Sequence, residues 1–150
     1  MAALAPDGKG TAPIVFFDGA CPLCNRSVAF LARRDRSGRL FFAHLQGEIA
    51  ARHLDPALRS VARDGTVVLF EPGAGGRVSV RSAAVLRALS YTAPRWGFLA
   101  RLAGWPGVQP VLDVAYGFVA RRRDAWFGRA ATCALPDPAL RARFLDSDQA

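Results

Sequence analysis

The feature that most constrains this chain is a short N-terminal segment in which two cysteines lie where a strand meets a helix. Residues 14–17 are apolar and β-prone, which predicts a strand over 13–17 that is buried on both faces. Asp18-Gly19 ends this run as a turn. Pro22 suits the first turn of a helix, because its missing N–H costs no hydrogen bond there. We therefore expect Cys21 at the N-cap and Cys24 about one turn into the helix.

The predicted helix start would make the thiol of Cys21 reactive. Unpaired backbone N–H groups and the positive end of the helix dipole point at its sulfur, and such a site stabilises the reactive thiolate. Two intervening residues also let Cys21 and Cys24 close into a small disulfide ring. We interpret the pair as a redox-active dithiol, in which Cys21 attacks because it lies nearer the turn and is more exposed. Cys24 would then resolve the mixed disulfide.

Other readings of a Cys-x-x-Cys pair are weaker here. Copper chaperones usually have Met two residues before the first Cys, where this chain has Gly19. A structural zinc site needs about four ligands, and His44, His53 and Cys133 form no second closely spaced pair. An Asp-x-Asp-Gly phosphatase would need its nucleophile at Phe16. A metal-binding module remains the leading rival, and two buried cysteines that only pack remain a further alternative.

Two charged residues beside the pair have open roles. Asp18 could take and return the proton of Cys24 as a general base, or its side-chain oxygens could cap the turn. Close to Cys21, its negative charge would also raise the pKa of that thiol. Arg26 would favour the thiolate, or would simply be solvated.

The residues Asp18-Gly-Ala-Cys21-Pro-Leu-Cys24-Asn25 resemble the signature of the DCC thiol-disulfide oxidoreductase-like family, which is named for its Asp-x-x-Cys-x-x-Cys motif. Weaker similarity continues through 26–31, 39–42, 82–87 and 116–123. The resemblance implies a thioredoxin-like fold and protein-disulfide reductase activity.

The chain departs from thioredoxin in two places. Pro22 follows the first cysteine, whereas thioredoxin has proline before the second. No proline directly precedes the apolar run 66–70, where thioredoxins place a cis-proline that helps to hold the substrate backbone. This departure weakens the expectation of general protein reduction.

Composition supports a folded domain in a reducing compartment. Of the 150 residues, 51% are hydrophobic and 21% are charged, as in one globular domain with a real core. Three cysteines are too few, and odd in number, for a secreted disulfide scaffold. Residues 1–10 lack the pattern of a signal peptide. We expect a cytoplasmic protein whose Cys-x-x-Cys rests mostly as a dithiol.

The elements predict a mixed α/β domain. Strands are expected at 13–17, 39–43, 66–70 and 77–80, and helices at 22–35, 46–53, 56–62, 82–91, 95–103 and 108–123. The first two strands should be parallel and the last two should form an antiparallel hairpin. Ser82 is expected to be an N-cap. We predict a leader over 1–12, a thioredoxin-like domain with a C-terminal helical extension over 13–126, and a tail over 127–150 that wraps on the domain.

The net charge of +8 is unevenly placed. Residues 77–129 contain nine Arg against two Asp, a net charge of +7, together with all three Trp. This region, with Arg121, Arg122 and Arg123, could contact an anionic membrane or an acidic partner, or it could reflect a general use of Arg in place of Lys. No specific nucleic-acid contact is expected. The apolar stretch 102–120 contains two Pro, three Gly and Asp113, which argues against a membrane span.

The remaining candidate residues are expected to be structural. His44 and His53 have no visible partner, and a packed histidine is the expected role for each. Cys133 is expected to pack as a free thiol, with a second resolving thiol or a third metal ligand as alternatives. No cofactor is expected beyond the Cys21–Cys24 couple. The expected partners are a disulfide-containing protein or small-thiol substrate and a reductant that recycles the site.

Overall fold

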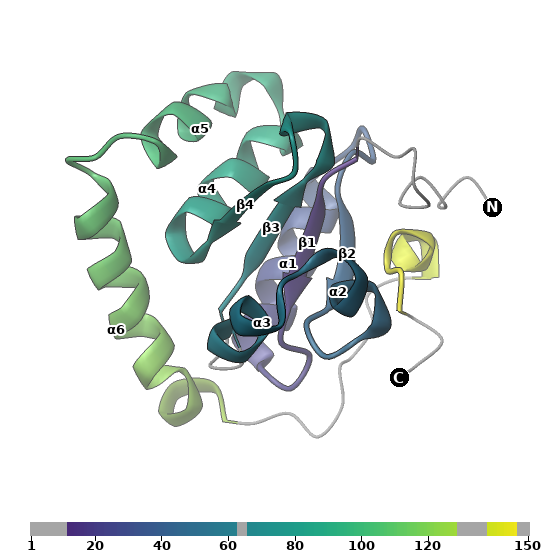
Figure 1. Ribbon diagram of the computed structural model, residues 1–150, viewed down its shortest axis with the longest axis horizontal. Helices are drawn as coiled ribbons and strands as arrows, with labels where there is room; N and C mark the ends of the chain where they lie inside the picture. The colour runs from purple at the N-terminus through teal and green to yellow at the C-terminus, as the bar shows by residue number, and fades with distance from the viewer. Residues whose placement is uncertain (1–11, 63–65, 129–137, 147–150) are drawn as a thin grey trace.

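The computed structural model describes residues 12–62, 66–128 and 138–146, and its centre is a four-stranded mixed sheet with the strand order β2-β1-β3-β4 (Figure 1). The strands are β1 (Ile14–Phe17), β2 (Phe41–His44), β3 (Val68–Glu71) and β4 (Arg77–Val80). β1 pairs with β2 in parallel and with β3 antiparallel, and β3 and β4 form the antiparallel hairpin. The predicted α/β, thioredoxin-like fold with a mixed sheet is confirmed.

Helices cover both faces of this sheet (Figure 1). They are α1 (Pro22–Arg34), α2 (Glu48–His53), α3 (Pro56–Ala62), α4 (Arg81–Thr92), α5 (Gly97–Ala103) and α6 (Gln109–Phe127), with the 3-10 helices η2 (Pro72–Ala74), η3 (Pro94–Trp96) and η4 (Pro138–Arg143). One hydrophobic cluster joins the sheet to α1 and α4, and a second joins it to α2 and α3.

The alternation of side chains along β1 explains these two clusters. Val15 and Phe17 point into the cluster with α1, whereas Ile14 and Phe16 point into the other. Successive residues of a strand face opposite sides of a sheet, so a central strand covered on both faces must be apolar throughout. All four residues are at most 1% exposed, as expected for this position.

The start of α4 differs from the prediction that Ser82 is its N-cap. The N-cap is Val80, which makes no side-chain cap hydrogen bond. Arg81 begins the helix with a positive φ of 56°, so Ser82 already lies inside the helix. Its hydroxyl donates to the Asp113 carboxylate at 2.5 Å and ties α4 to α6. The expected cap is wrong because this contact with α6 takes the serine hydroxyl.

A buried ion pair attaches α4 to the hairpin. Glu71, at the end of β3, is 1% exposed. It accepts two hydrogen bonds from the Arg87 guanidinium, at 2.7 and 2.9 Å, and one from the Tyr91 hydroxyl at 2.5 Å. These bonds satisfy the carboxylate where water cannot reach it, and they fix α4 against the sheet.

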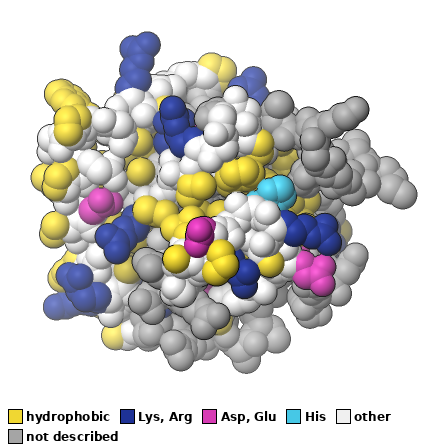
Figure 2. Space-filling model, in the orientation of Figure 1, with side chains coloured by type: hydrophobic (Ala, Val, Ile, Leu, Met, Phe, Trp, Pro, Cys, Tyr) yellow, Lys and Arg dark blue, Asp and Glu magenta, His cyan; other side chains and the backbone are white. Residues whose placement is uncertain are grey.

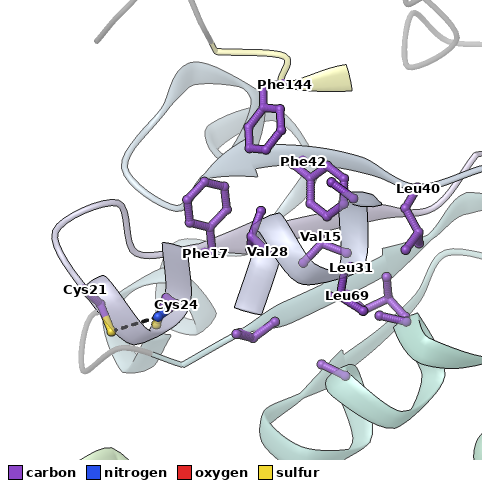
Figure 3. Close-up of a cluster of buried hydrophobic side chains, with 14 residues drawn as sticks. Val15, Phe17, Cys21, Cys24, Val28, Leu31, Leu40, Phe42, Leu69 and Phe144 are labelled. Atoms are coloured by element: carbon purple, nitrogen blue, oxygen red, sulfur yellow. Dashed lines mark hydrogen bonds between the residues drawn. The ribbon is translucent and has the colours of Figure 1, made fainter. Parts of the chain in front are cut away.

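The C-terminal segment 138–146 folds back onto the outer strand β2. Phe144 forms a parallel bridge with Phe42 and stacks on its ring at 5.1 Å. The N–H of Leu145 donates to the Phe42 carbonyl at 2.9 Å, and the N–H of His44 donates to the Asp146 carboxylate at 2.9 Å. This part of the predicted tail therefore wraps on the domain, and Phe144 joins the core (Figure 3).

Arg143 holds the same segment through the end of α1. Its guanidinium donates to the Asp35 carboxylate at 2.6 Å and to the carbonyls of Leu40 and Ala32 at 2.9–3.0 Å. The Asp35 side chain is fully buried, and that of Arg143 is 14% exposed. Asp35 also accepts from the N–H of Leu40 at 2.7 Å. The pair thus joins the α1–β2 connection to η4.

Within the described part of the chain, no helix combines the length and the hydrophobicity that a membrane crossing requires.

Candidate active site

The two cysteines lie at the start of α1, in the strand–turn–helix arrangement that the sequence predicts (Figure 3). Cys21 is the N-cap, with φ −95° and ψ 111°, and Pro22 occupies the first helical turn. The N–H of Cys24 donates to the Cys21 sulfur at 3.3 Å. The sulfur thus replaces the oxygen of an ordinary cap and receives one of the unpaired N–H groups of the helix. Both cysteines are thiols, with no disulfide between them.

Burial does not distinguish the two cysteines. Cys21 is 3% exposed and Cys24 is 4% exposed, so the expectation that Cys21 is the more exposed is wrong. The reason is packing, since both cysteines belong to the hydrophobic cluster that contains Phe17 and Val28. Their roles must therefore be separated by electrostatics rather than by access.

The Cys21 thiol is strongly acidified. Its pKa falls from an ordinary 9.0 to about 6, chiefly because the Cys24 side chain donates a hydrogen bond to the thiolate. Burial opposes this, while the backbone N–H of Cys24 and the charge of Arg123 favour the thiolate, and the negative Asp18 disfavours it. Hydrogen bonds to the charged form outweigh desolvation here. Cys21 is therefore largely a thiolate at neutral pH.

Cys24 is shifted in the opposite direction. Its hydrogen bond to Cys21, its burial and the negative charge of Cys21 all raise the pKa of the Cys24 thiol. One proton is shared between two adjacent sulfurs, so the first to ionise suppresses the second. The pair therefore has one thiolate, on Cys21, and one thiol, on Cys24.

Asp18 forms the turn that presents Cys21. Its Oδ1 accepts the N–H of Ala20 at 3.0 Å, and its carbonyl accepts the N–H of Cys21 at 3.2 Å. This is the capping role that the sequence allowed. Its charge also raises the pKa of both cysteine thiols, which places the carboxylate near enough to affect their protons.

Two side chains of α6 complete the site, and sequence reasoning did not assign them to it. Arg123 and Tyr116 line a small cavity of about 60 Å³ together with Cys24. The Tyr116 hydroxyl accepts the N–H of Val67, directly before β3, at 3.1 Å. Residues seven apart lie on the same face of a helix, so this spacing could have indicated a shared role. Arg26 instead has an exposed side chain on α1.

Neither histidine points to a second function. The His44 ring lies 4.8 Å from the Phe17 ring, and burial lowers the pKa of His44 despite the nearby carboxylates of Asp146 and Asp18. The His53 ring packs 5.3 Å from Phe70. No three His, Cys, Asp or Glu side chains gather as metal ligands would in the described ranges. Cys133 lies outside those ranges, so its expected role stays a prediction.

We predict that Cys21 reacts with iodoacetamide much faster than Cys24 at neutral pH. The rate at Cys21 should rise as the pH passes about 6, the pKa of its thiol, and should then level off, because the thiolate is the nucleophile. Mass spectrometry after brief labelling across a pH series measures both rates. Preferential labelling of Cys24, or a rate that still rises toward pH 9, would contradict the assignment.

A paired substitution tests the cause of this acidity. Arg123→Gln should move the midpoint of the labelling profile upward, because the positive charge that favours the thiolate is lost. Arg122→Gln is the matched control, since it removes the same charge one residue away, from an exposed side chain whose guanidinium lies 4.6 Å from the Phe118 ring. Equal midpoints for the two variants would exclude a specific effect of Arg123.

The fold and this site together define a thioredoxin-like protein with an acidified dithiol at the start of its first helix. The profile of the DCC1-like thiol-disulfide oxidoreductase family matches residues 15–129. The chain therefore belongs to that family, as its Asp18-x-x-Cys21-x-x-Cys24 motif indicated.

Two curated relatives agree with this placement. The chain is 33% identical over 132 residues to the uncharacterised protein YuxK of Bacillus subtilis. The aligned region covers 88% of this chain and 93% of YuxK. It is 35% identical over 126 residues to a chloroplastic DCC family protein of Arabidopsis thaliana. Here the aligned region covers 82% of this chain and 69% of that protein. No solved structure matches the chain.

Proposed function

We propose that this protein reduces disulfides of proteins or small molecules by dithiol-disulfide exchange at Cys21 and Cys24. The observation that supports this most is the N-cap position of Cys21, where two hydrogen bonds from Cys24 lower the pKa of its thiol to about 6. An attacking thiol is most effective when its pKa lies near the ambient pH. The protein would act in the cytoplasm, where a reductant keeps the pair as a dithiol.

The exchange has two steps. The Cys21 thiolate attacks one sulfur of the substrate disulfide, forms a mixed disulfide, and releases the other half as a thiolate. This removes the hydrogen bond and the negative charge that raise the pKa of Cys24. Cys24 can then lose its proton and attack the Cys21 sulfur, which closes the Cys21–Cys24 disulfide and releases the second thiolate. Two electrons pass to the substrate.

We further propose that Asp18 accepts the proton of Cys24 in the second step. Asp18→Asn should prolong the mixed disulfide several-fold without destabilising the fold, since Asn keeps the turn oxygen. Asp55→Asn is the matched control, because Asp55 forms the same turn with the N–H of Ala57 at 2.8 Å on an exposed surface. Quenched-flow trapping of the mixed disulfide measures this step, and unchanged kinetics would remove Asp18 from the mechanism.

The reduction potential of the Cys21–Cys24 couple is the decisive test of this function. Equilibration with glutathione buffers should give a two-electron transition near the thioredoxin value of about −270 mV. A pair that cannot be oxidised would contradict the proposal. The control is metal analysis of anaerobically purified protein, because stoichiometric zinc or copper would favour the metal-binding alternative.

A second candidate function is contact with an anionic membrane surface through α5, α6 and the turn between them. Large hydrophobic side chains are exposed there: Phe98, Trp105, Val111, Val114, Phe118, Val119 and Trp126. On the face seen in Figure 2, hydrophobic side chains gather along the left edge, with arginine side chains nearby. Aromatic rings and arginines side by side suit the boundary between headgroups and acyl chains. We propose that this surface rests on anionic lipid.

Flotation with vesicles tests this second function. The protein should float with phosphatidylserine vesicles at low salt and much less with phosphatidylcholine vesicles. Val114→Glu should abolish flotation, whereas Val78→Glu on β4, also an exposed valine, should not. Equal behaviour of the two variants would exclude the membrane contact, and binding to an acidic protein without lipid would favour the other expected partner.

A further inference from the structure

A large hollow beside α1 is lined by five arginines. Its volume is about 890 Å³, and its charged lining residues are Arg26, Arg33, Arg34, Arg36 and Arg95. The side chains of Phe30 and Trp96 also border it, and no Asp or Glu is among the described residues that line it. We name this hollow the arginine groove. Its size is that of a site for a small organic ligand.

The arginine groove is adjacent to two further hollows that lead to the active site. An apolar groove of about 290 Å³ shares Arg26 and Phe30 with it. The small cavity that contains Cys24 in turn shares Ser27, Val67 and Val85 with the apolar groove. Hollows that share lining residues are neighbours, so the three follow one another from the arginines to Cys24, the partner of Cys21 in the dithiol.

The periodicity of α1 explains this order. Leu23, Ser27, Phe30 and Arg34 are spaced by four, three and four residues, so they form one stripe along the helix. Leu23 lines the cavity with Cys24, and Arg34 lines the arginine groove. Ten residues separate Cys24 from Arg34, about 15 Å at the rise of a helix. A ligand that spans both ends must have an arm of about this length.

We infer that these hollows bind a low-molecular-weight disulfide whose far end bears phosphate or carboxylate groups. Its arm would lie in the apolar groove, its anionic end among the arginines, and its sulfur beside the Cys21–Cys24 pair. This inference rests on the proposed function and names its substrate class. Planar guanidinium groups bind phosphate and carboxylate in bidentate fashion, and one of them, that of Arg34, lies over the Phe30 ring, 5.1 Å from its centroid.

The charge balance supports an anion in this groove. The C-terminal end of α1 has a partial negative charge of about half a unit, which is small beside five arginines. Each arginine of the groove has an exposed side chain, so water screens each contribution. Several arginines acting on a ligand with more than one negative charge are therefore needed for useful affinity.

Two observations favour a small disulfide over a protein disulfide. Cys21 is only 3% exposed, which suits a slender arm better than a folded protein chain. The N–H of Val67, directly before β3, already donates to the Tyr116 hydroxyl at 3.1 Å. An extended peptide therefore cannot take this N–H as a backbone contact.

The reaction with such a substrate balances as for any disulfide. Cys21 displaces one thiolate of the substrate, and Cys24 displaces the other from Cys21, so one disulfide becomes two thiols while the protein is oxidised. A low-molecular-weight dithiol, such as dithiothreitol added to the reaction, then returns two electrons and two protons to the Cys21–Cys24 disulfide.

A matched pair of substrates tests this inference. Pantethine and coenzyme A disulfide have the same thiol arm, but only the latter ends in a phosphorylated nucleotide. The wild-type protein should reduce coenzyme A disulfide with a kcat/KM about tenfold above that for pantethine, with a preference that falls as salt increases. Arg33→Gln/Arg36→Gln should remove most of this preference by raising KM. Arg52→Gln, exposed on α2, should keep it.

The outcomes separate this inference from the proposed function. Failure to reduce either substrate, or insulin, would refute the proposed function. Equal reduction of both, unaffected by salt or by the double variant, would overturn the inference and leave the function standing. Faster reduction of insulin than of coenzyme A disulfide or pantethine would also overturn the inference. Glutathione disulfide, whose negative charges are all carboxylates, tests whether the groove accepts carboxylate in place of phosphate. Calorimetric titration of the Cys21→Ser protein with coenzyme A should show binding. Adding Arg33→Gln/Arg36→Gln to this protein should weaken that binding. No binding to the Cys21→Ser protein would count against the site.

Discussion

Cys21→Ser will lower disulfide reduction by roughly three orders of magnitude or more, because it removes the nucleophile of the first step. A serine hydroxyl does not ionise near neutral pH, and the hydrogen bonds from Cys24 that acidify the thiol cannot compensate. Cys24→Ser will behave differently. Cys21 keeps its N-cap position, so the first step proceeds and the mixed disulfide accumulates.

Intact mass spectrometry after mixing with a substrate disulfide distinguishes the two variants. Cys24→Ser should show one substrate half attached through Cys21, and Cys21→Ser should show none. The far-ultraviolet circular dichroism of both should match the wild type, which excludes unfolding. A substrate adduct on Cys24 in the Cys21→Ser protein at a comparable rate would reverse the assigned roles.

Arg143→Met will destabilise the fold by about 3–5 kcal/mol, because it leaves the buried Asp35 carboxylate without its ion-pair partner. The pair is joined at 2.6 Å, and the Asp35 side chain is fully buried. The same change removes the donors to the carbonyls of Leu40 and Ala32. Urea unfolding followed by circular dichroism measures the loss as a change in the free energy of unfolding.

The control for this prediction lies two residues away. Arg141→Met changes an exposed side chain of the same 3-10 helix and should alter the free energy of unfolding by at most about 0.5 kcal/mol. Arg143→Met combined with Asp35→Asn should recover part of the loss, since no buried charge is then left unpaired. Equal stability of the Arg141 and Arg143 variants would show that the ion pair does not hold the segment.

The sequence predicts those parts of the fold that depend on local pattern. The strand–turn–helix around Cys21 follows from an apolar run, a turn pair and a proline, and each of these acts within a few residues. The hairpin follows from a short connection, and the parallel first pair follows from a connection long enough to hold the crossover helix α1. The position of Cys21 as the N-cap of α1 was predictable for the same reason.

The features that local pattern could not predict depend on contacts between distant segments. Ser82 is not a cap because Asp113, on another helix, accepts its hydroxyl hydrogen bond. Cys21 is buried rather than exposed because it packs in a cluster drawn from several elements. Arg123 acts on Cys21 across about a hundred residues of chain. Such pairings follow from tertiary packing, which one sequence does not specify residue by residue.

The C-terminal segment 138–146, which folds back onto β2, also affects whether this protein associates with other chains. β2 is an outer strand of the sheet, and an uncovered outer strand offers N–H and carbonyl groups with which another chain can pair. Here the Phe42 carbonyl already accepts from Leu145, and the His44 N–H already donates to Asp146. Residues 144–146 thus cover this edge, so that the chain itself blocks intermolecular strand pairing and the aggregation that follows from it.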